Sequence, residues 1–148
     1  MKQKRFSEAQ QEYRPLLQFE AERAATHYGL AGVYFQSRSV DRAEHHLREA
    51  LRLQPNHKMA HYDLGAMLVE TGALDEGIEH LRTCVQLDPD YGDGYYNLAV
   101  ALAAHGSLVE AAKEIKIALS LQPEDDQTQR FSRHLSALIE DHARLGGR

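Results

Sequence analysis

Apolar and polar residues follow one another in a pattern that returns every 34 residues along the chain. Each copy contains two stretches in which apolar residues recur at helical spacing, and each copy closes on a proline: Pro55, Pro89 or Pro123. A proline has no backbone N–H and disfavours the α conformation of the residue before it, so the second helix of each copy must end there. The pattern therefore predicts three consecutive helix–turn–helix units. They span residues 24–57, 58–91 and 92–125.

Aligned at the prolines, the three units share small and apolar residues at equivalent positions. Positions 4, 7, 8 and 11 of a unit lie on one face of its first predicted helix, and positions 20, 24 and 27 lie on one face of the second. Small residues at positions 8 and 20 allow the two helices to approach to about 8–10 Å. One helix pair cannot bury its apolar face alone, so stacking of the units is expected to supply the core. The small pairs are Ala31 with Ala43, Gly65 with Gly77, and Ala99 with Ala111.

The turn between the two helices of a unit has its own signal. Gly72 and Gly106 occupy the same position in the second and third units, and glycine readily takes the positive φ that ends a helix. Arg38 stands at that position in the first unit and predicts a weaker stop. Beyond the turn, an Asp or Ser followed three residues later by Glu predicts a capping box that opens the second helix. The predicted boxes are Asp41 with Glu44 and Ser107 with Glu110.

These units resemble tetratricopeptide repeats (TPR). The residues that carry the resemblance are HYGLAGVY with AEHHLREALRLQP, HYDLGAML with GIEHLRTCVQLDP, and YYNLAVAL with AAKEIKIALSLQP. The resemblance implies an all-α fold, a right-handed α-solenoid of three TPR helix–turn–helix units. The sequence departs from the family at position four of each unit, where the family favours Trp or another large apolar group. This chain has His27, His61 and Tyr95 there.

The segment before the first unit predicts a partial leading helix. Residues 7–20 match the second helix of a repeat, because Ala9, Tyr13 and Leu16 fall in its apolar positions. Pro15 lies inside this segment, and a proline in a helix interior costs about 3 kcal/mol. We therefore expect either a kink just before Pro15 or a helix that starts there.

The segment after the third unit predicts a capping helix over residues 126–145. Its apolar residues lie on a single face and the rest of the helix is polar, which is typical of the element that keeps the end of a repeat array soluble. The apolar face holds Phe131, Leu135, Leu138, Ile139 and His142.

The family resemblance also implies a binding surface. In TPR proteins a second stripe on the first helices lines a concave groove in which partner peptides lie, and Tyr28, Tyr62 and Tyr96 repeat along that stripe here. Aromatic side chains with polar tips are typical of binding hot spots, although a tyrosine at this position also packs between repeats. Both interpretations stay open. The predicted groove residues are Tyr28, Phe35, Met59, Tyr62, Asp63, Val69, Glu70, Asp93, Tyr96, Asn97 and Val100.

The charge of this stripe favours one kind of partner. Asp63, Glu70 and Asp93 make it acidic, so we expect a protein or peptide that carries Lys or Arg beside apolar anchors. Some TPR proteins hold a C-terminal carboxylate with Lys, Arg and Asn. Of the matching positions here only Asn97 fits, so this mode of binding is not expected.

Histidine and cysteine do not predict a reactive centre. His57 and His61 have the i, i+4 spacing that suits zinc on a helix, but His57 falls in the turn before the helix and no third ligand is evident. Cys84 is the single cysteine and occupies a small-residue packing position, which favours a buried, inert thiol. The sequence has no phosphate-binding loop and no nucleophile elbow. We therefore expect no catalytic residue, no cofactor and no metal, and a protein that is not an enzyme.

Composition and charge narrow the class of protein. Of the 148 residues, 43% are hydrophobic and 26% are charged, as in ordinary folded domains. Residues 58–125 hold 12 acidic and 4 basic side chains, which argues against a nucleic-acid partner. No run of 18 apolar residues predicts a membrane span. The basic N-terminus lacks the apolar stretch of a signal peptide, so a cytoplasmic location is expected, with a removed signal as the open alternative.

Together these patterns predict a protein–protein interaction module, an adaptor or scaffold that binds a partner peptide or helix in its groove. One alternative is structural self-assembly into a homo-oligomer, because the N-terminal helix has no polar cap and a large apolar end invites association. Another is a regulatory TPR fragment of a larger enzyme. The residues predicted to mediate oligomerisation are Tyr13, Leu16, Leu17 and Phe19.

Overall fold

The structure is a computed structural model that describes the backbone of residues 2–146 and the side chains of residues 15 and 18–146. The described residues form seven α-helices and no strand, which confirms the predicted all-α class. The helices are α1 (Lys2–Gln36), α2 (Val40–Leu53), α3 (Lys58–Glu70), α4 (Leu74–Leu87), α5 (Gly92–His105), α6 (Leu108–Leu121) and α7 (Asp126–Gly146).

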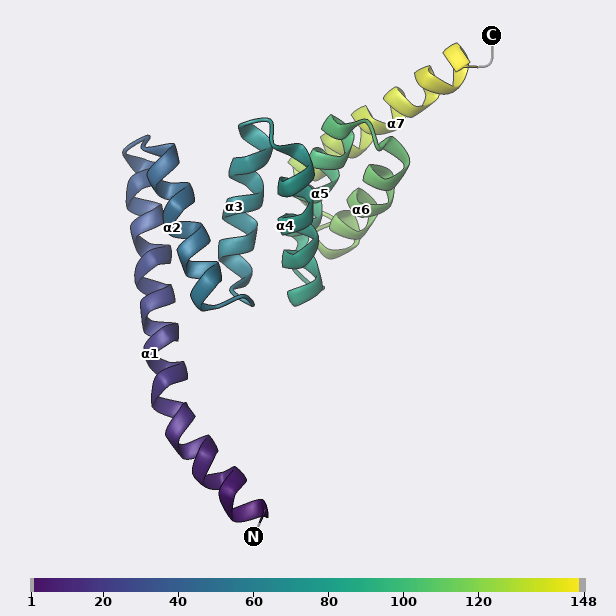
Figure 1. Cartoon of the computed structure of the whole chain (residues 1–148). Helices are drawn as coiled ribbons and strands as arrows, with labels where there is room; N and C mark the ends of the chain where they lie inside the picture. Colours follow the sequence, from purple (N-terminus) through teal and green to yellow (C-terminus); the bar gives the residue numbers. More distant parts are fainter. Residues whose placement is uncertain (1, 147–148) are drawn as a thin grey trace. The chain divides into compact units, whose positions relative to one another are not determined.

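The chain divides into two compact units, Met1–Ala60 and His61–Arg148. In the first unit, α2 packs antiparallel to the C-terminal half of α1 (Figure 1). In the second unit, α4 packs on α5, α5 on α6 and α6 on α7. Within this unit, consecutive helices from α4 to α7 pack on one another, which is how stacked helix pairs share one core.

Helix α1 is longer than the sequence pattern predicts. The leading helix expected over residues 7–20 does not form a separate element, because α1 runs unbroken from Lys2 to Gln36 with Pro15 inside it. A helix that starts at Pro15 is therefore wrong, whereas Figure 1 shows a bend in the N-terminal half of α1, drawn in purple. At the position where the later copies have their prolines, this leading copy has Ala21. No proline therefore stops the helix between the leading segment and the first unit.

The first unit buries a small core between α1 and α2. Ala31 of α1 and Ala43, Leu47 and Ala50 of α2 are all buried, at the positions that the alignment of units predicts. Three of these four residues are alanines, so the two helices can pack closely with little side-chain volume between them.

Paired histidines join the two helices of the first and second repeats. His27 Nδ1 lies 2.9 Å from His46 Nδ1, and the His46 ring stacks on Tyr34 with centroids 5.2 Å apart. His61 and His80 show the same arrangement in the second repeat, again with 2.9 Å between their Nδ1 atoms. Two nitrogens at this distance form a hydrogen bond only when one donates and the other accepts. The position-four histidines are therefore polar links between helices.

Helices α3 and α4 meet at two glycines. A Cβ atom added to Gly77 would lie 2.9 Å from the Gly65 carbonyl oxygen and 2.8 Å from Val69 Cγ2. A Cβ atom added to Gly65 would lie 2.7 Å from Leu81 Cγ. Real Cβ atoms do not approach so closely, so the two helix backbones leave no room for a side chain here. The predicted role of small residues at positions 8 and 20 is confirmed.

The core of the second unit continues through α5, α6 and α7. Buried side chains from three successive helices meet in one apolar cluster, so this core is shared between repeats. Its large and small members in these helices are Leu98, Ala99, Ala101, Leu102, Ala111, Ile115, Ala118 and Leu135.

Helix α7 presents one apolar face to that cluster. Leu135 is buried, and Phe131 and Ile139 pack against the cluster while partly exposed. Leu138 is half-buried, but His142 is exposed. The predicted apolar face is therefore confirmed except at His142, where the C-terminal end of α7 extends past α6 (Figure 1).

The turns inside the repeats adopt the left-handed conformation that the glycine positions predict. Gly72 and Gly106 have φ values of 89° and 92°. Arg38 stands at the same position of the first repeat and has φ 60°. In this conformation the Cβ of a non-glycine residue is strained.

Replacing Arg38 by Gly is expected to raise the free energy of unfolding by about 0.5–1 kcal/mol, because glycine adopts this φ without a Cβ clash. Urea denaturation followed by circular dichroism at 222 nm measures the change. The matched control is Gly106→Arg, which makes the reverse exchange in the third repeat and should lower the free energy of unfolding by a similar amount. Equal midpoints for Arg38→Gly and the native chain would contradict the strain at Arg38.

The predicted capping boxes are wrong. Ser39, and not Asp41, is the N-cap residue of α2, and Ser107 is the N-cap residue of α6. Neither serine side chain bonds to the first turn of its helix. Glu44 forms an ion pair with Arg48, at 2.8 Å, instead of reaching back to the helix start. A glutamate at this position therefore finds a cation more readily than a backbone N–H.

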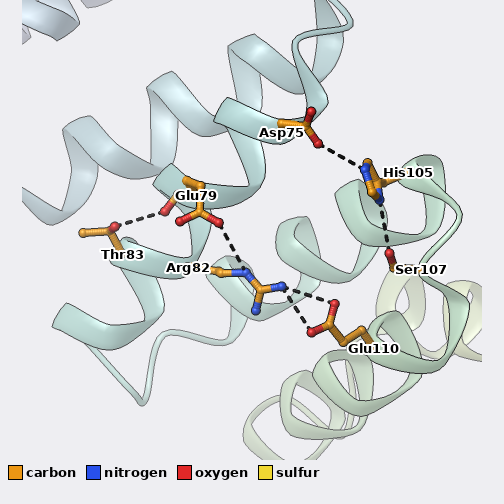
Figure 2. A network of polar contacts seen from close by, with 7 residues as sticks. All are labelled: Asp75, Glu79, Arg82, Thr83, His105, Ser107 and Glu110. Atoms are coloured by element: carbon orange, nitrogen blue, oxygen red, sulfur yellow. Dashed lines mark hydrogen bonds and ion pairs between the residues drawn. The ribbon is translucent and has the colours of Figure 1, made fainter.

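Glu110 also does not reach back to the start of its helix. It belongs instead to a polar network that joins two repeats (Figure 2). Arg82 Nη2 of α4 donates to both carboxylate oxygens of Glu110 on α6, at 3.3 and 3.2 Å. His105 Nε2 lies 3.1 Å from Asp75 Oδ1, and its Nδ1 lies 3.1 Å from Ser107 Oγ. These contacts fix α4 against the turn between α5 and α6.

Side-chain caps occur instead at the starts of α3 and α7. The Ala60 N–H donates to His57 Nδ1 at 3.1 Å, and the Thr128 N–H donates to Asp125 Oδ2 at 2.7 Å. Hydrogen bonds from the Thr128 side chain and backbone hold the pKa of Asp125 below its usual value. Both capping residues occupy the last position of a repeat, so each caps the first helix of the next.

Among the residues that the structure describes, none of the helices is both long enough and apolar enough to cross a membrane.

Candidate partner-binding surface

Four predicted groove residues come together between α3 and α5 of the second unit. Tyr62 and Asp63 lie on α3, and Asp93 and Asn97 lie on α5; we call these four the α3/α5 surface. Burial raises the pKa of the Tyr62 phenol, the carboxylates of Asp93 and Asp63 raise it further, and a hydrogen bond with Asn97 acts in the opposite direction. The phenol therefore stays neutral at physiological pH, beside two carboxylates that give the surface its negative charge.

Tyr62 also has a packing role. Its ring contacts the edge of Tyr91, with centroids 5.2 Å apart and planes at 73°. Burial likewise raises the pKa of Tyr91. In the first unit, Tyr28 contacts the His57 ring at 4.7 Å, and each of these pairs is separated by 29 residues. In the first two repeats the tyrosine thus packs on the turn that follows the second helix, which supports the structural interpretation of this position.

Asp93 is held in place at the start of α5. Gln122 Nε2 donates a hydrogen bond to Asp93 Oδ1 at 3.0 Å, and the Gln122 side chain packs directly against Gly92. The carboxylate is exposed, so it is both oriented and available to a cation.

A second feature lies between α5 and α7, where Tyr96 borders an open pocket of about 540 Å³. The Tyr96 ring contacts Phe131 edge-on at 5.7 Å, and Gln127 Nε2 donates to the Tyr96 hydroxyl at 3.0 Å. Arg130 Nη2 lies 4.0 Å from Asp126 Oδ2, and both side chains are exposed. The residues that line this α5/α7 pocket are Tyr96, Asp126, Gln127, Arg130, Phe131 and His134.

The sequence analysis missed the contribution of α7 to this surface. Continuing the 34-residue count places Gln127, Arg130 and His134 at positions 2, 5 and 9 of a fourth unit, which are the positions of the predicted groove stripe. Treating α7 as a cap hid that signal. The first helix of a further repeat would present the same face whether or not a second helix follows it.

The remaining predicted groove residues of the second compact unit differ in exposure and packing. Val69 lies against Gly77 of α4, so part of its side chain is used in packing between helices. Val100 is half-buried and Glu70 is exposed. In the first unit, Phe35 is exposed and Met59 is half-buried.

The predicted oligomerisation residues fall mainly outside the described side chains. This is true of Tyr13, Leu16 and Leu17. Phe19 is described and exposed, and the Arg23 guanidinium lies 5.7 Å from the centre of its ring.

The two histidines considered for a metal site, and Cys84, have structural surroundings. His57 accepts the capping hydrogen bond from Ala60, and His61 pairs with His80, so the two histidines of the predicted i, i+4 pair have different partners. Cys84 is fully buried. In the part of the chain that the structure describes, no three His, Cys, Asp or Glu side chains converge to hold a metal ion.

These observations define a helical-repeat protein whose repeats are stacked antiparallel helix pairs. Two family models, both described as tetratricopeptide repeat, match the sequence over residues 28–92 and 68–135. The chain belongs to the tetratricopeptide repeat family, and its fold is an all-α solenoid of TPR units. No curated protein matches the sequence.

Solved structures with a similar fold are TPR domains. The first TPR domain of Spaghetti (RPAP3), bound to the HSP90 peptide SRMEEVD, has a TM-score of 0.78 and 18% identity over 81% of this chain and 95% of that one. The Arabidopsis OM64 TPR domain has a TM-score of 0.75 and 15% identity over 80% and 98%. The Sgt2 TPR domain from Aspergillus fumigatus also has a TM-score of 0.75 and 15% identity, over 82% of each chain.

Proposed function

We propose that this chain is a protein-interaction module that binds a basic peptide segment with apolar anchors on the first helices of its second unit. The observation that carries the proposal is the α3/α5 surface, where two carboxylates, Asp63 and Asp93, flank the neutral phenol of Tyr62. A Lys or Arg side chain of the partner would pair with the carboxylates, and an adjacent apolar side chain would pack on the exposed part of the ring.

The α5/α7 pocket differs from the α3/α5 surface in its chemistry. It offers the rings of Tyr96 and Phe131 together with the cation of Arg130. A partner segment that carries a basic residue at one end and an apolar or acidic residue at the other therefore fits the charges of the two features together.

The peptide bound to the Spaghetti domain supplies a useful contrast. SRMEEVD is acidic towards its C-terminus. Asp63 and Asp93 would repel such a peptide, and Asn97 alone matches the residues by which TPR proteins of that kind hold a carboxylate. We infer that the partner of this chain differs in charge from that peptide.

Fluorescence anisotropy with labelled peptides tests the proposal. Eight-residue peptides in which Lys or Arg alternates with Leu or Phe are expected to bind, and SRMEEVD is expected not to. The pair Asp63→Asn with Asp93→Asn should weaken binding of the basic peptides roughly three- to tenfold, since exposed ion pairs contribute at most about 1 kcal/mol each. Binding should also weaken as salt is raised from about 50 to 500 mM.

The matched control is Glu79→Gln with Glu124→Gln, which removes the same charge at exposed sites outside the α3/α5 surface. This control should leave the dissociation constants unchanged. Equal losses in the two double variants would mean that net charge, and not this surface, attracts the peptides. Preferential binding of SRMEEVD would overturn the proposed partner class.

Self-assembly through the N-terminal helix is a second candidate function, and the exposure of Phe19 on α1, at 58%, favours it.

A further inference from the structure

The polar groups that line the α5/α7 pocket are mainly hydrogen-bond donors. Gln127 Nε2 donates to the Tyr96 hydroxyl at 3.0 Å, so this oxygen acts as the acceptor and keeps its own proton for a further partner. The Arg130 guanidinium has N–H donors and no acceptor, and the His134 ring donates from at least one nitrogen. A ligand group that fits these donors is rich in acceptors, as a carboxylate is.

One carboxylate of this chain, that of Asp126, also lines the pocket. Its Oδ2 lies 4.0 Å from Arg130 Nη2, which is longer than a hydrogen bond, and the two side chains are 83% and 77% exposed. An exposed pair of this kind contributes at most about 1 kcal/mol. Asp126 also lies in the first turn of α7, where the positive end of the helix dipole stabilises a carboxylate. Arg130 can therefore turn to a carboxylate of a partner while Asp126 keeps a favourable position.

The apolar wall of the pocket consists of two aromatic rings. Tyr96 and Phe131 meet edge-on with centroids 5.7 Å apart, and both side chains are half-buried. The volume of about 540 Å³ lies within the range of pockets that hold ligand groups. An aromatic side chain packs on such rings in offset or edge-on geometry, which contributes about 0.5–1.5 kcal/mol beyond the burial of its area. The wall therefore favours an aromatic side chain over a small aliphatic one.

We propose that the α5/α7 pocket holds an aromatic side chain of the partner segment, while the side-chain carboxylate of the residue next to it pairs with Arg130. This inference rests on the proposed function, because it specifies the part of the same segment that lies beside the basic residue. The partner motif is an aromatic residue directly next to an Asp or Glu.

The spacing between this motif and the basic residue follows from α5. Asp93 and Tyr96 are three residues apart on this helix, so their side chains start about 5–6 Å apart. In an extended peptide, residues i and i+2 point to the same side and lie about 6.6–6.8 Å apart. The basic residue that pairs with Asp93 is therefore two positions from the aromatic residue, and the acidic residue lies on the far side. A second basic residue there would face the Arg130 guanidinium, so the charges of this surface select one order of residues.

Short peptides test the motif in both chain directions. GKGFEG and GEFGKG, each with a fluorophore at the N-terminus and an amide at the C-terminus, place Phe two positions from Lys and have no terminal carboxylate. The one that binds more tightly in fluorescence anisotropy is the reference peptide. Exchange of its Glu for Gln should weaken binding about three- to fivefold, because an exposed ion pair contributes at most about 1 kcal/mol. Exchange of its Phe for Ala should weaken binding about tenfold, because the peptide loses its aromatic anchor.

Arg130→Gln tests the pairing of the carboxylate. In this variant the reference peptide and its Gln counterpart should bind equally, because the carboxylate has lost its cation. The control Arg144→Gln changes the same charge at an exposed site about 21 Å further along α7, and it should retain the difference. A difference that persists in Arg130→Gln, or that disappears in Arg144→Gln as well, overturns the pairing. Equal binding of the reference peptide and its Ala counterpart overturns the aromatic site.

The proposed function and this inference fail in different ways. Asp63→Asn with Asp93→Asn should weaken the reference peptide and its two counterparts by the same factor, because each contains one Lys. No loss for any of them would overturn the proposed basic partner. Loss for all three, together with an unchanged difference in Arg130→Gln, would overturn the inference alone.

Discussion

Gly77→Ala is expected to lower the free energy of unfolding by about 1–2 kcal/mol, although alanine is the better helix former by about 1 kcal/mol. The cause is the contact between α3 and α4. The new methyl group would lie 2.9 Å from the Gly65 carbonyl oxygen and 3.1 Å from the Val69 backbone nitrogen. Both are backbone atoms that cannot rotate away, so the helices must separate, and overpacking of this kind typically costs about 1–3 kcal/mol.

The matched control is Gly32→Ala, in the interior of α1, where an added Cβ meets nothing within 4 Å. The same exchange should there raise stability by up to about 1 kcal/mol, because only helix propensity changes. Urea denaturation of both variants by circular dichroism gives the two values. Stabilisation by Gly77→Ala would show that α3 and α4 separate without loss, which the contact distances contradict.

This opposite effect of one exchange at two glycines shows what the sequence could and could not predict. The 34-residue period and the prolines predicted the three helix pairs, because a proline acts locally and in the same way in every repeat. The period also predicted that Gly65 and Gly77 would face each other. It could not show that this pair packs more closely than Ala31 with Ala43 or Ala99 with Ala111, since helix separation depends on the whole core.

The leading segment shows how one position changes the fold. Residues 7–20 have the apolar positions of a second helix, and a separate leading helix was expected there. Ala21 stands where the later copies have proline, and the helix continues into α1. Pro15 lies inside α1 and does not end it. The sequence analysis gave weight to the proline that is present and overlooked the one that is missing from the repeat.

Helix caps were hard to predict because polar side chains have several partners. Ser107 with Glu110 has the spacing of a capping box, but Arg82 of another helix takes the carboxylate of Glu110. The residues that do cap helices, His57 and Asp125, stand at the last position of a repeat. A cation that arrives through tertiary packing cannot be read from local sequence, whereas a cap at a fixed repeat position can.

The candidate binding surface was predicted in its acidic part and missed in its pocket. Tyr62, Asp63, Asp93 and Asn97 influence one another as the helical stripe suggests. The place of Arg130 and His134 at the α5/α7 pocket was missed, because α7 was interpreted only as an end cap. Their positions in a fourth count of 34 residues were available in the sequence.

The side chain at position four of each repeat, with its partner on the second helix, makes the stability of the chain depend on pH. The first and second repeats pair His27 with His46 and His61 with His80. In the third repeat the equivalent residues are Tyr95 and Glu114.

Burial raises the pKa of Glu114, so that carboxyl binds its proton more readily in the folded chain. Its contribution to stability therefore grows as the pH falls. The contribution of the first repeat to stability changes in the opposite direction as the pH falls.

Burial lowers the pKa of His46 below 6.5, the neighbouring His27 and His45 lower it further, and Glu49 acts in the opposite sense. The folded chain therefore binds fewer protons than the unfolded chain at mildly acidic pH. A histidine with a lowered pKa contributes full stability above about pH 6.5 and loses it as the pH falls below that value. Geometry gives the same sign, since two protonated rings with Nδ1 atoms 2.9 Å apart would repel each other.

His46→Gln is therefore expected to reduce the loss of stability between pH 7.5 and pH 5.5. Each proton that the folded state fails to bind costs about 1.4 kcal/mol per pH unit, so removing one such site changes the slope measurably. Urea denaturation at steps of half a pH unit gives the slope. His142→Gln is the control, because His142 is exposed and lies far along α7. An equal slope in the native chain and in His46→Gln would show that the pair takes up its second proton without separating α1 from α2.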